Sequence, residues 1–189
     1  MKVVGISGSS RKNGNTAIII KTIFEELSKV GIETELIQLA DIDIQPCRAC
    51  FACKGKRNCV FKSDGFSDVF NRVVEADGII LGSPVYSADV SSKMKAFLDR
   101  GGVVVATNPG LLKHKLGASV AAVRRAGGMT AVDTMNHFML NKEMIVVGST
   151  YWNMVYGREI GDVMNDEEGM ANMRNLGQNM AWLLKTILR

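Results

Sequence analysis

The sequence has no cysteine outside residues 47–59, and it contains neither a long apolar run nor a continuous run of Lys and Arg. No apolar stretch approaches the roughly eighteen residues of a membrane span, so we expect no membrane association. The net charge of +4 is mild and the basic residues form no run, which argues against a nucleic-acid-binding surface. The apolar start of the chain is too short for a signal peptide, so we expect a cytoplasmic protein.

The chain also lacks the residue sets that hydrolysis requires. It has two histidines, neither with a partner at metal-ligand spacing, and no Ser-His-Asp set or carboxylate pair is discernible. Its 189 residues suit a single domain, 1–189, that is large enough to fold without disulfides. We therefore look for function in the loops that join its regular elements.

Apolar segments of two kinds alternate along the chain. Periodicity predicts strands at 2–7, 32–39, 77–84, from 117, and 144–150. It predicts helices at 15–31, 64–76, 91–102, 130–143 and 167–189, with Asp64 as an N-cap and the glycines 101–102 as a helix stop. This alternation predicts an α/β fold with a parallel sheet covered on both faces. A ligand should bind beyond the carboxyl ends of the strands.

The loop after the first strand, "SGSSRKNGNT" (7–16), is rich in hydrogen-bond donors and has no acidic residue. It leads into a helix N-terminus, which attracts phosphate. The loop matches neither the P-loop nor the dinucleotide fingerprint. It therefore predicts a cradle for one terminal phosphate, such as that of FMN, although an ordinary loop that caps the helix stays open. The candidate residues are Ser9, Ser10, Arg11, Asn13, Asn15 and Thr16.

The loops after the third and fourth strands should meet the first loop at the same edge of the sheet. Pro84, Val85 and Tyr86 offer an apolar edge beside backbone N–H groups, which suits an isoalloxazine ring. The segment "RRAGG" (124–128) adds Arg124, Arg125 and the permissive Gly127. A core or dimer contact at Tyr86 and a solvated basic turn at 124–128 stay open as alternatives.

The four cysteines have the spacing C-x2-C-x2-C-x5-C within an insertion at about 44–63. Three thiolates at such intervals can wrap one face of a cubane cluster, and a fourth nearby can close it. The spacing is awkward for a tetrahedral zinc ion, which usually uses two separate C-x2-C pairs. A [4Fe–4S] cluster, redox-active free thiols and zinc are the three interpretations. The candidate ligands are Cys47, Cys50, Cys53 and Cys59.

Over nearly its whole length the chain resembles the NADPH-dependent FMN reductase branch of the flavodoxin-like proteins. The resemblance rests on "GSSRKNGNT" and on "SPVYSADVSSKMKAFLDR". It implies a doubly wound five-stranded sheet in the order 2-1-3-4-5, and a dimer or tetramer. It also implies phosphate binding by Ser9, Arg11, Asn13, Asn15 and Thr16, and ring binding by Pro84, Val85, Tyr86 and Ser87.

The cysteine motif is similar to that of the iron–sulfur flavoprotein subgroup of this branch. That similarity implies an FMN-dependent oxidoreductase with a [4Fe–4S] cluster, linking a one-electron carrier such as ferredoxin, or NAD(P)H, to a small-molecule acceptor. One alternative is a cluster-free NAD(P)H-dependent reductase of flavins, quinones, or nitro- or azo-aromatics. Another is a non-catalytic electron carrier or redox sensor.

Overall fold

The computed structural model describes residues 1–187, which form six strands, five α-helices and two 3-10 helices. The strands are β1 (Lys2–Ser7), β2 (Glu33–Gln38), β3 (Gly78–Pro84), β4 (Leu116–Val123), β5 (Ile145–Val146) and β6 (Met154–Tyr156). The α-helices are α1 (Asn15–Ser28), α2 (Phe66–Glu75), α3 (Ser92–Ala106), α4 (Gly128–Leu140) and α5 (Glu167–Ile187). The 3-10 helices are η1 (Leu39–Asp41) and η2 (Asp162–Asn165).

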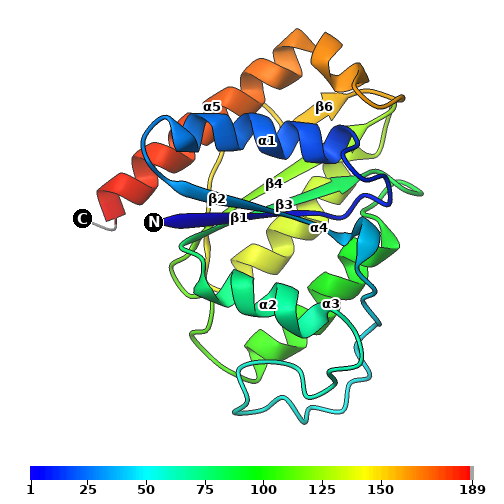
Figure 1. Ribbon diagram of the computed structural model, residues 1–189, viewed down its shortest axis with the longest axis vertical. Helices are drawn as coiled ribbons and strands as arrows, with labels where there is room; N and C mark the ends of the chain where they lie inside the picture. The colour runs from blue at the N-terminus through cyan, green and yellow to red at the C-terminus, as the bar shows by residue number, and fades with distance from the viewer. Residues whose placement is uncertain (188–189) are drawn as a thin grey trace.

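The strands form one parallel sheet in the order β2-β1-β3-β4-β5 (Figure 1). Strands β3 and β4 lie at its centre, and every residue of β4 is buried. This confirms the predicted α/β fold and strand order. A strand that is covered on both faces has apolar residues at consecutive positions, and this pattern predicts the central strands from the sequence.

The last predicted strand, 144–150, is wrong in its length. The chain leaves the sheet after Val147, whose N–H donates to Gly117 O at 2.8 Å, and returns at Asn153, whose carbonyl accepts from Ala121 N at 2.9 Å. Between them the Ser149 hydroxyl hydrogen-bonds to Asn153 Oδ1 at 2.5 Å and stabilises a turn. Strand β6 then continues the pairing beside the second half of β4.

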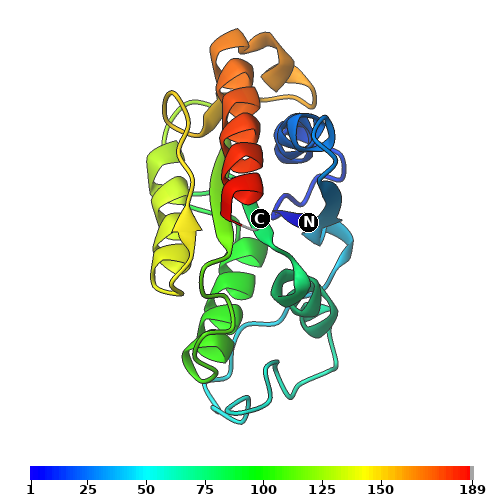
Figure 2. The same cartoon turned by 90° about the vertical axis from the view of Figure 1, so that its left-hand side faces the viewer.

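Helices cover both faces of the sheet. Helices α1 and α5 pack side by side on one face, while α2, α3 and α4 cover the other (Figures 1 and 2). Helix α3 runs past the two glycines that were predicted to end it. A Cβ at Gly101 would lie 3.1 Å from a ring carbon of Phe70, so Gly101 allows α2 and α3 to pack closely. That packing outweighs the low helix propensity of glycine.

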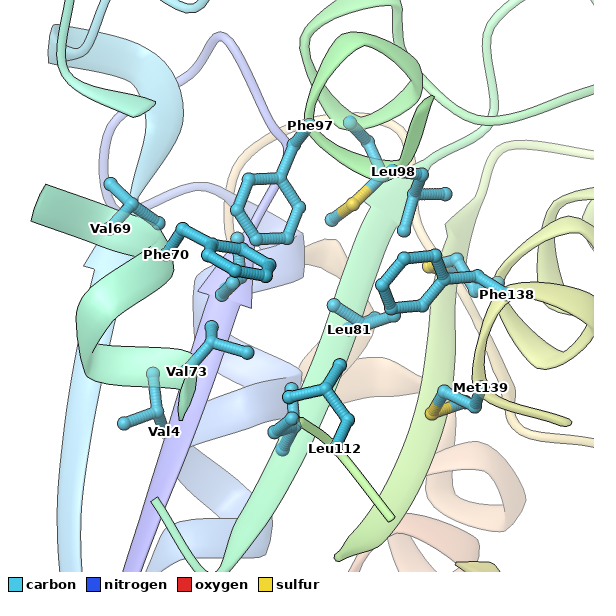
Figure 3. Packing of buried hydrophobic residues seen from close by; sticks show 14 of the residues in the cluster. Val4, Val69, Phe70, Val73, Leu81, Phe97, Leu98, Leu112, Phe138 and Met139 are labelled. Carbon is cyan, nitrogen blue, oxygen red and sulfur yellow. The ribbon is translucent and has the colours of Figure 1, made fainter. Parts of the chain in front are cut away.

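The core between the sheet and α2, α3 and α4 is built on aromatic side chains. Phe66 and Phe70 stack with ring centroids 5.2 Å apart, and Phe97 lies 5.7 Å from Phe66. Figure 3 shows Phe70 and Phe97 pointing toward the sheet, with Phe138 approaching from α4. Replacing one such buried ring by Ala typically costs about 3–5 kcal/mol of stability. This core holds α3, the helix that contacts both candidate sites described below.

The cysteine-rich segment, residues 44–63, has no helix or strand and projects beyond α2 and α3 (Figure 1). The loops after β1, β3 and β4 lie at the carboxyl ends of the strands, where the sequence predicts that a ligand binds. Within residues 1–187, no helix combines the length and the apolar composition that a membrane crossing requires.

Candidate functional site

The loops after β1, β3 and β4 meet at one cleft of about 360 Å³. This volume lies within the range typical of small-molecule sites, about 300–1,000 Å³. Eight residues predicted from the sequence line the cleft: Ser9, Arg11, Asn15, Thr16, Pro84, Val85, Tyr86 and Arg124. Four further lining residues, Ala122, Gly157, Arg158 and Glu159, were not anticipated.

The loop after β1 places backbone and hydroxyl donors at the start of α1. Ser9 Oγ accepts a hydrogen bond from Arg11 N at 3.0 Å, which tightens the turn, and Gly14 precedes the helix. The Thr16 side chain is buried, and its hydroxyl has no hydrogen-bond partner among residues 1–187. A buried polar atom without a partner costs stability unless a ligand satisfies it. Together with the positive end of the helix dipole, Thr16 fits a phosphate group.

Two of the predicted phosphate-binding side chains hold a distant loop in place. Asn15 Nδ2 donates to Glu159 O at 2.8 Å, and Asn15 Oδ1 accepts from Gly161 N at 2.8 Å. Arg11 donates to Arg158 O at 3.1 Å. The loop 157–161 thereby becomes one wall of the cleft. The residues of this loop have neither strand nor helix periodicity. Apart from Gly157, Arg158 and Gly161, nothing in the sequence indicates that the loop lies at a binding site.

Five predicted residues lie outside the lining of the cleft. Asn13 N donates to Gln38 Oε1 at 2.7 Å, so Asn13 joins the loop to the end of β2. Ser10 and Arg125 are exposed. Ser87 and Gly127 act through the backbone, as described next.

The segment after β3 makes a tight turn in which Tyr86 and Asp89 exchange backbone hydrogen bonds of 2.8 and 3.0 Å. Ser87 and Ala88 at its centre have φ values of 49° and 64°, in the left-handed region. This conformation costs about 1–2 kcal/mol for each L-residue, and such strain clusters at functional sites. Gly127 packs against the turn, since a Cβ there would lie 2.8 Å from Ala88 Cα.

The cysteine loop forms a second candidate site, because all four cysteines line one cavity together with Arg100. Cys53 and Cys59 are buried, whereas Cys50 is exposed. None of the four is in a disulfide within the described part of the chain. The cavity is narrow, about 20 Å³, so the outer part of the loop would have to open to admit a cluster.

The C-terminal end of α3 anchors the inner part of the cysteine loop. Asn108 Nδ2 donates to Cys53 O at 3.0 Å, and Asn108 Oδ1 accepts from Arg57 N at 3.1 Å. The Cys53 thiol and the Thr107 hydroxyl share a hydrogen bond of 3.3 Å. A second anchor is Asn58, whose amide donates to Asn71 Oδ1 at 2.7 Å on α2. Cys53 and Cys59 are thus held by neighbouring helices.

The backbone around the outer cysteines adopts an unusual conformation. Ala49, Phe51 and Arg57 have left-handed φ values of 49°, 54° and 57°. The N–H of Ala49 donates to Cys47 Sγ at 3.4 Å. The left-handed conformation costs energy for residues other than glycine, and such strained residues cluster at functional sites.

The four thiols provide the donors that an iron–sulfur cluster uses. In the part of the chain that is described, no three His, Cys, Asp or Glu side chains converge on a point where one metal ion could bind. In a [4Fe–4S] cluster each of four thiolates binds a different iron. Four cysteines that line one cavity are a donor set of this kind.

A buried ion pair closes the base of the cysteine loop. Arg100 of α3 pairs with Asp64, and their side chains are 4% and 2% exposed. Asp64 Oδ1 also accepts from Phe66 N at 3.3 Å at the start of α2, so Asp64 binds the helix N-terminus as predicted, although the N-cap position itself is Gly65. Burial opposes the charge on Arg100, but hydrogen bonds to Asp64 and Cys59 outweigh it and raise the pKa of Arg100. Burial likewise acts to raise the pKa of Asp64, but Arg100 outweighs it and the pKa is lowered.

Comparison with known proteins gives consistent matches. The model of the family described as NADPH-dependent FMN reductase matches residues 1–159. An iron-sulfur flavoprotein of Methanocaldococcus jannaschii is 39% identical over 194 residues, covering 99% of both chains. An iron-sulfur flavoprotein of Methanosarcina thermophila is 35% identical over 150 residues, covering 78% of each. An archaeal flavodoxin structure has a TM-score of 0.64 at 18% identity, covering 98% of this chain and 99% of its own.

Proposed function

We propose that this chain, which belongs to the NADPH-dependent FMN reductase family, holds a [4Fe–4S] cluster on its four cysteines in addition to FMN. The family and its iron-sulfur flavoprotein relatives identify the chain as an FMN-dependent oxidoreductase of the iron–sulfur flavoprotein type. Bound FMN supplies one- and two-electron chemistry, and a [4Fe–4S] cluster exchanges one electron at a time. The observation that carries the proposal is the single cavity lined by all four cysteines.

The cleft at the sheet edge supplies the groups that FMN binding requires. The Thr16 hydroxyl and the N–H groups at the start of α1 would bind the phosphate. Val85 and Tyr86 would contact the flavin ring, with Arg124 as a cation at its polar edge. Arg11 and Asn15 would act mainly by holding the loop 157–161 against the cleft.

Charge supports a negatively charged electron carrier, such as ferredoxin, as a partner. The cysteine loop, residues 44–63, has five Lys and Arg residues and no acidic residue. The rest of the chain therefore has one more acidic residue than basic residues, despite the net charge of +4. Lys54, Lys56 and Arg57 are exposed on this loop. Complementary charge steers association, and it would bring a one-electron donor close to the cysteines.

Exposed aromatic side chains support self-association into a homodimer or homotetramer. Tyr151, Trp152 and Trp182 are 66%, 55% and 66% exposed. Aromatic residues are enriched at interfaces between subunits. Size-exclusion chromatography with light scattering would show a species of more than one chain, and a monomer at micromolar concentration would contradict this proposal.

The test of the proposed function is anaerobic purification with iron, sulfide and FMN analysis. We expect about four iron atoms and one FMN per chain, and an iron–sulfur electron paramagnetic resonance (EPR) signal after reduction with dithionite. Cys53→Ser should lose iron but retain FMN. The control, Lys56→Gln at an exposed position of the same loop outside the lining of the cavity, should retain both.

The cluster-free reductase is the second candidate, and the narrowness of the cavity among the cysteines, about 20 Å³, favours it because the loop would have to open to admit a cluster. In that case the anaerobic protein would contain FMN and less than one iron atom per chain. It would also oxidise NAD(P)H at a rate unchanged by Cys50→Ala. Anaerobic protein that contains FMN but less than one iron atom per chain would reject the proposed cluster, whatever its rate of NAD(P)H oxidation.

A further inference from the structure

Arg100 lies at the junction between α3 and the cysteine loop. Its guanidinium donates to Gln45 O at 3.3 Å and to Phe61 O at 2.9 Å, so one side chain joins the two ends of the loop. The same group pairs with Asp64 and lies 4.4 Å from the centre of the Phe66 ring. Arginine suits this position because its planar fork can donate to several acceptors at once.

The Arg100 guanidinium also faces the cysteines. It lines the same cavity as all four cysteines, Cys59 included. Arg100 of α3 is 3% exposed, whereas Arg48, the other cation that lines this cavity, is exposed. Solvent screens exposed charges strongly and buried charges much less. Arg100 is thus the buried cation of the cavity lining, and its charge acts there with little screening.

We propose that Arg100 positions the cysteine loop and supplies a buried positive charge beside Cys59 that makes reduction of the bound cluster more favourable. This inference rests on the proposed [4Fe–4S] cluster. Reduction by dithionite adds one electron and neither forms nor breaks a bond to the cysteines. The reduced form carries more negative charge, so a fixed cation nearby stabilises it and raises the reduction potential.

The test compares the midpoint potential, measured by dithionite titration followed by EPR, in variants of the full chain purified anaerobically. Arg100→Gln removes the cation, so the potential should become more negative. Asp64→Asn removes the opposing anion, so the potential should become more positive. A role limited to folding would not produce shifts of opposite sign.

Two further variants separate positioning from charge. Arg100→Lys keeps the charge but cannot reach both Gln45 and Phe61, so iron per FMN should fall while the potential stays near wild type. Arg100→Gln leaves Asp64 buried and unpaired, which threatens folding. The double variant Arg100→Gln/Asp64→Asn avoids this with a neutral pair, and its potential should lie between those of wild type and Arg100→Gln.

The control is Lys95→Gln, which removes an exposed positive charge from the same helix and should leave potential and iron content unchanged. If Arg100→Gln and the double variant both keep the iron content and the midpoint potential of wild type, the proposed role of Arg100 is wrong, while the proposed cluster stands. Shifts of the same sign in Arg100→Gln and Asp64→Asn would also overturn it. Wild-type protein with FMN but no iron would overturn this inference together with the proposed cluster.

Discussion

The Ser91 hydroxyl donates a hydrogen bond of 2.6 Å to the Gly8 carbonyl oxygen and so joins the start of α3 to the loop after β1. Ser91 Oγ also accepts from Met94 N at 3.2 Å, which caps α3. Ser91 N donates to Ser83 Oγ at 2.9 Å. Two of the loops at the proposed FMN cleft, those after β1 and β3, are therefore connected through one buried serine.

Ser91→Ala should lower the free energy of unfolding by about 2 kcal/mol. The estimate combines about 1 kcal/mol for the lost helix cap with about 1 kcal/mol for the buried hydrogen bond to Gly8. Urea denaturation of FMN-free protein measures it. Ser63→Ala, at an exposed serine, should change stability by less than about 0.5 kcal/mol. An unchanged urea midpoint for Ser91→Ala would show that this bond is not needed.

Thr16→Val should weaken FMN binding by about 1 kcal/mol or more, because it removes a hydroxyl placed for the phosphate. The stability of FMN-free protein should not fall, since this hydroxyl has no partner within residues 1–187. Fluorescence titration with FMN and urea denaturation measure the two effects, and iron content should not change.

The matched control for Thr16→Val is Thr22→Val on the same helix. The Thr22 hydroxyl donates to Ile18 O at 3.2 Å, outside the cleft. This variant should keep its FMN affinity. If Thr16→Val binds FMN as wild type does, the phosphate does not bind at Thr16.

Gly127→Ala should destabilise the protein more than Gly110→Ala, although both glycines have φ of 81°. The left-handed backbone costs about 1–2 kcal/mol for alanine at either position. At Gly127 the new Cβ also meets Ala88 Cα at 2.8 Å, whereas at Gly110 no described atom lies within 4 Å. Urea midpoints compare the stabilities, and FMN titration should show a loss of affinity for Gly127→Ala alone. Equal effects of the two variants would disprove the packing of 124–128 against the turn.

Acid should selectively remove the stabilisation that the Glu26 carboxylate provides by pairing with Lys29 and by accepting a hydrogen bond from Gln178 of α5 at 3.1 Å. The hydrogen bond from Lys29 outweighs burial and lowers the pKa of Glu26 below its ordinary value of 4.5. The unfolded chain therefore takes up this proton first, and stability falls as the pH drops below 4.5. The contribution is complete above that value and is lost as the pH falls through the lower pKa of the folded chain.

Urea midpoints of wild type and Glu26→Gln across this pH range provide the measurement. Their difference should be constant well above pH 4.5 and should shrink below it, since the wild-type carboxylate becomes protonated there. A difference that does not depend on pH would mean that Glu26 makes no charge-dependent contact with Lys29.

Local sequence patterns predicted most of the fold and part of the cleft. The periodicity of each strand and helix, and the hydroxyl groups of the loop after β1, lie within short stretches of sequence, so they are visible without the structure. Ser9 and Thr16 lie in the cleft as predicted. The predicted helix 91–102 ends before α3 does, because glycine has a low helix propensity. The close packing of Gly101 against Phe70, which offsets that propensity, is not visible in the sequence.

Contacts between distant segments could not be read in this way. The loop 157–161 enters the cleft because Asn15 holds Glu159, a residue 144 positions further along the chain. Asp64 was predicted at the start of a helix and does accept from Phe66 N there, but its pairing with Arg100, 36 positions away, was not predicted. No pattern in the sequence indicates either pairing, because the packing of the whole fold determines which distant side chains come together.

The sequence by itself determined the parallel α/β fold, the hydroxyl-rich loop after β1 and the presence of four clustered thiols, because these depend on residue type and spacing along the chain. Only the tertiary structure decided which loop completes the wall of the cleft proposed for FMN and which buried cation lines the cysteine cavity. Those choices depend on where packing of the two cores places α3 and the loop 157–161, and distance in space is not encoded in any single stretch of sequence.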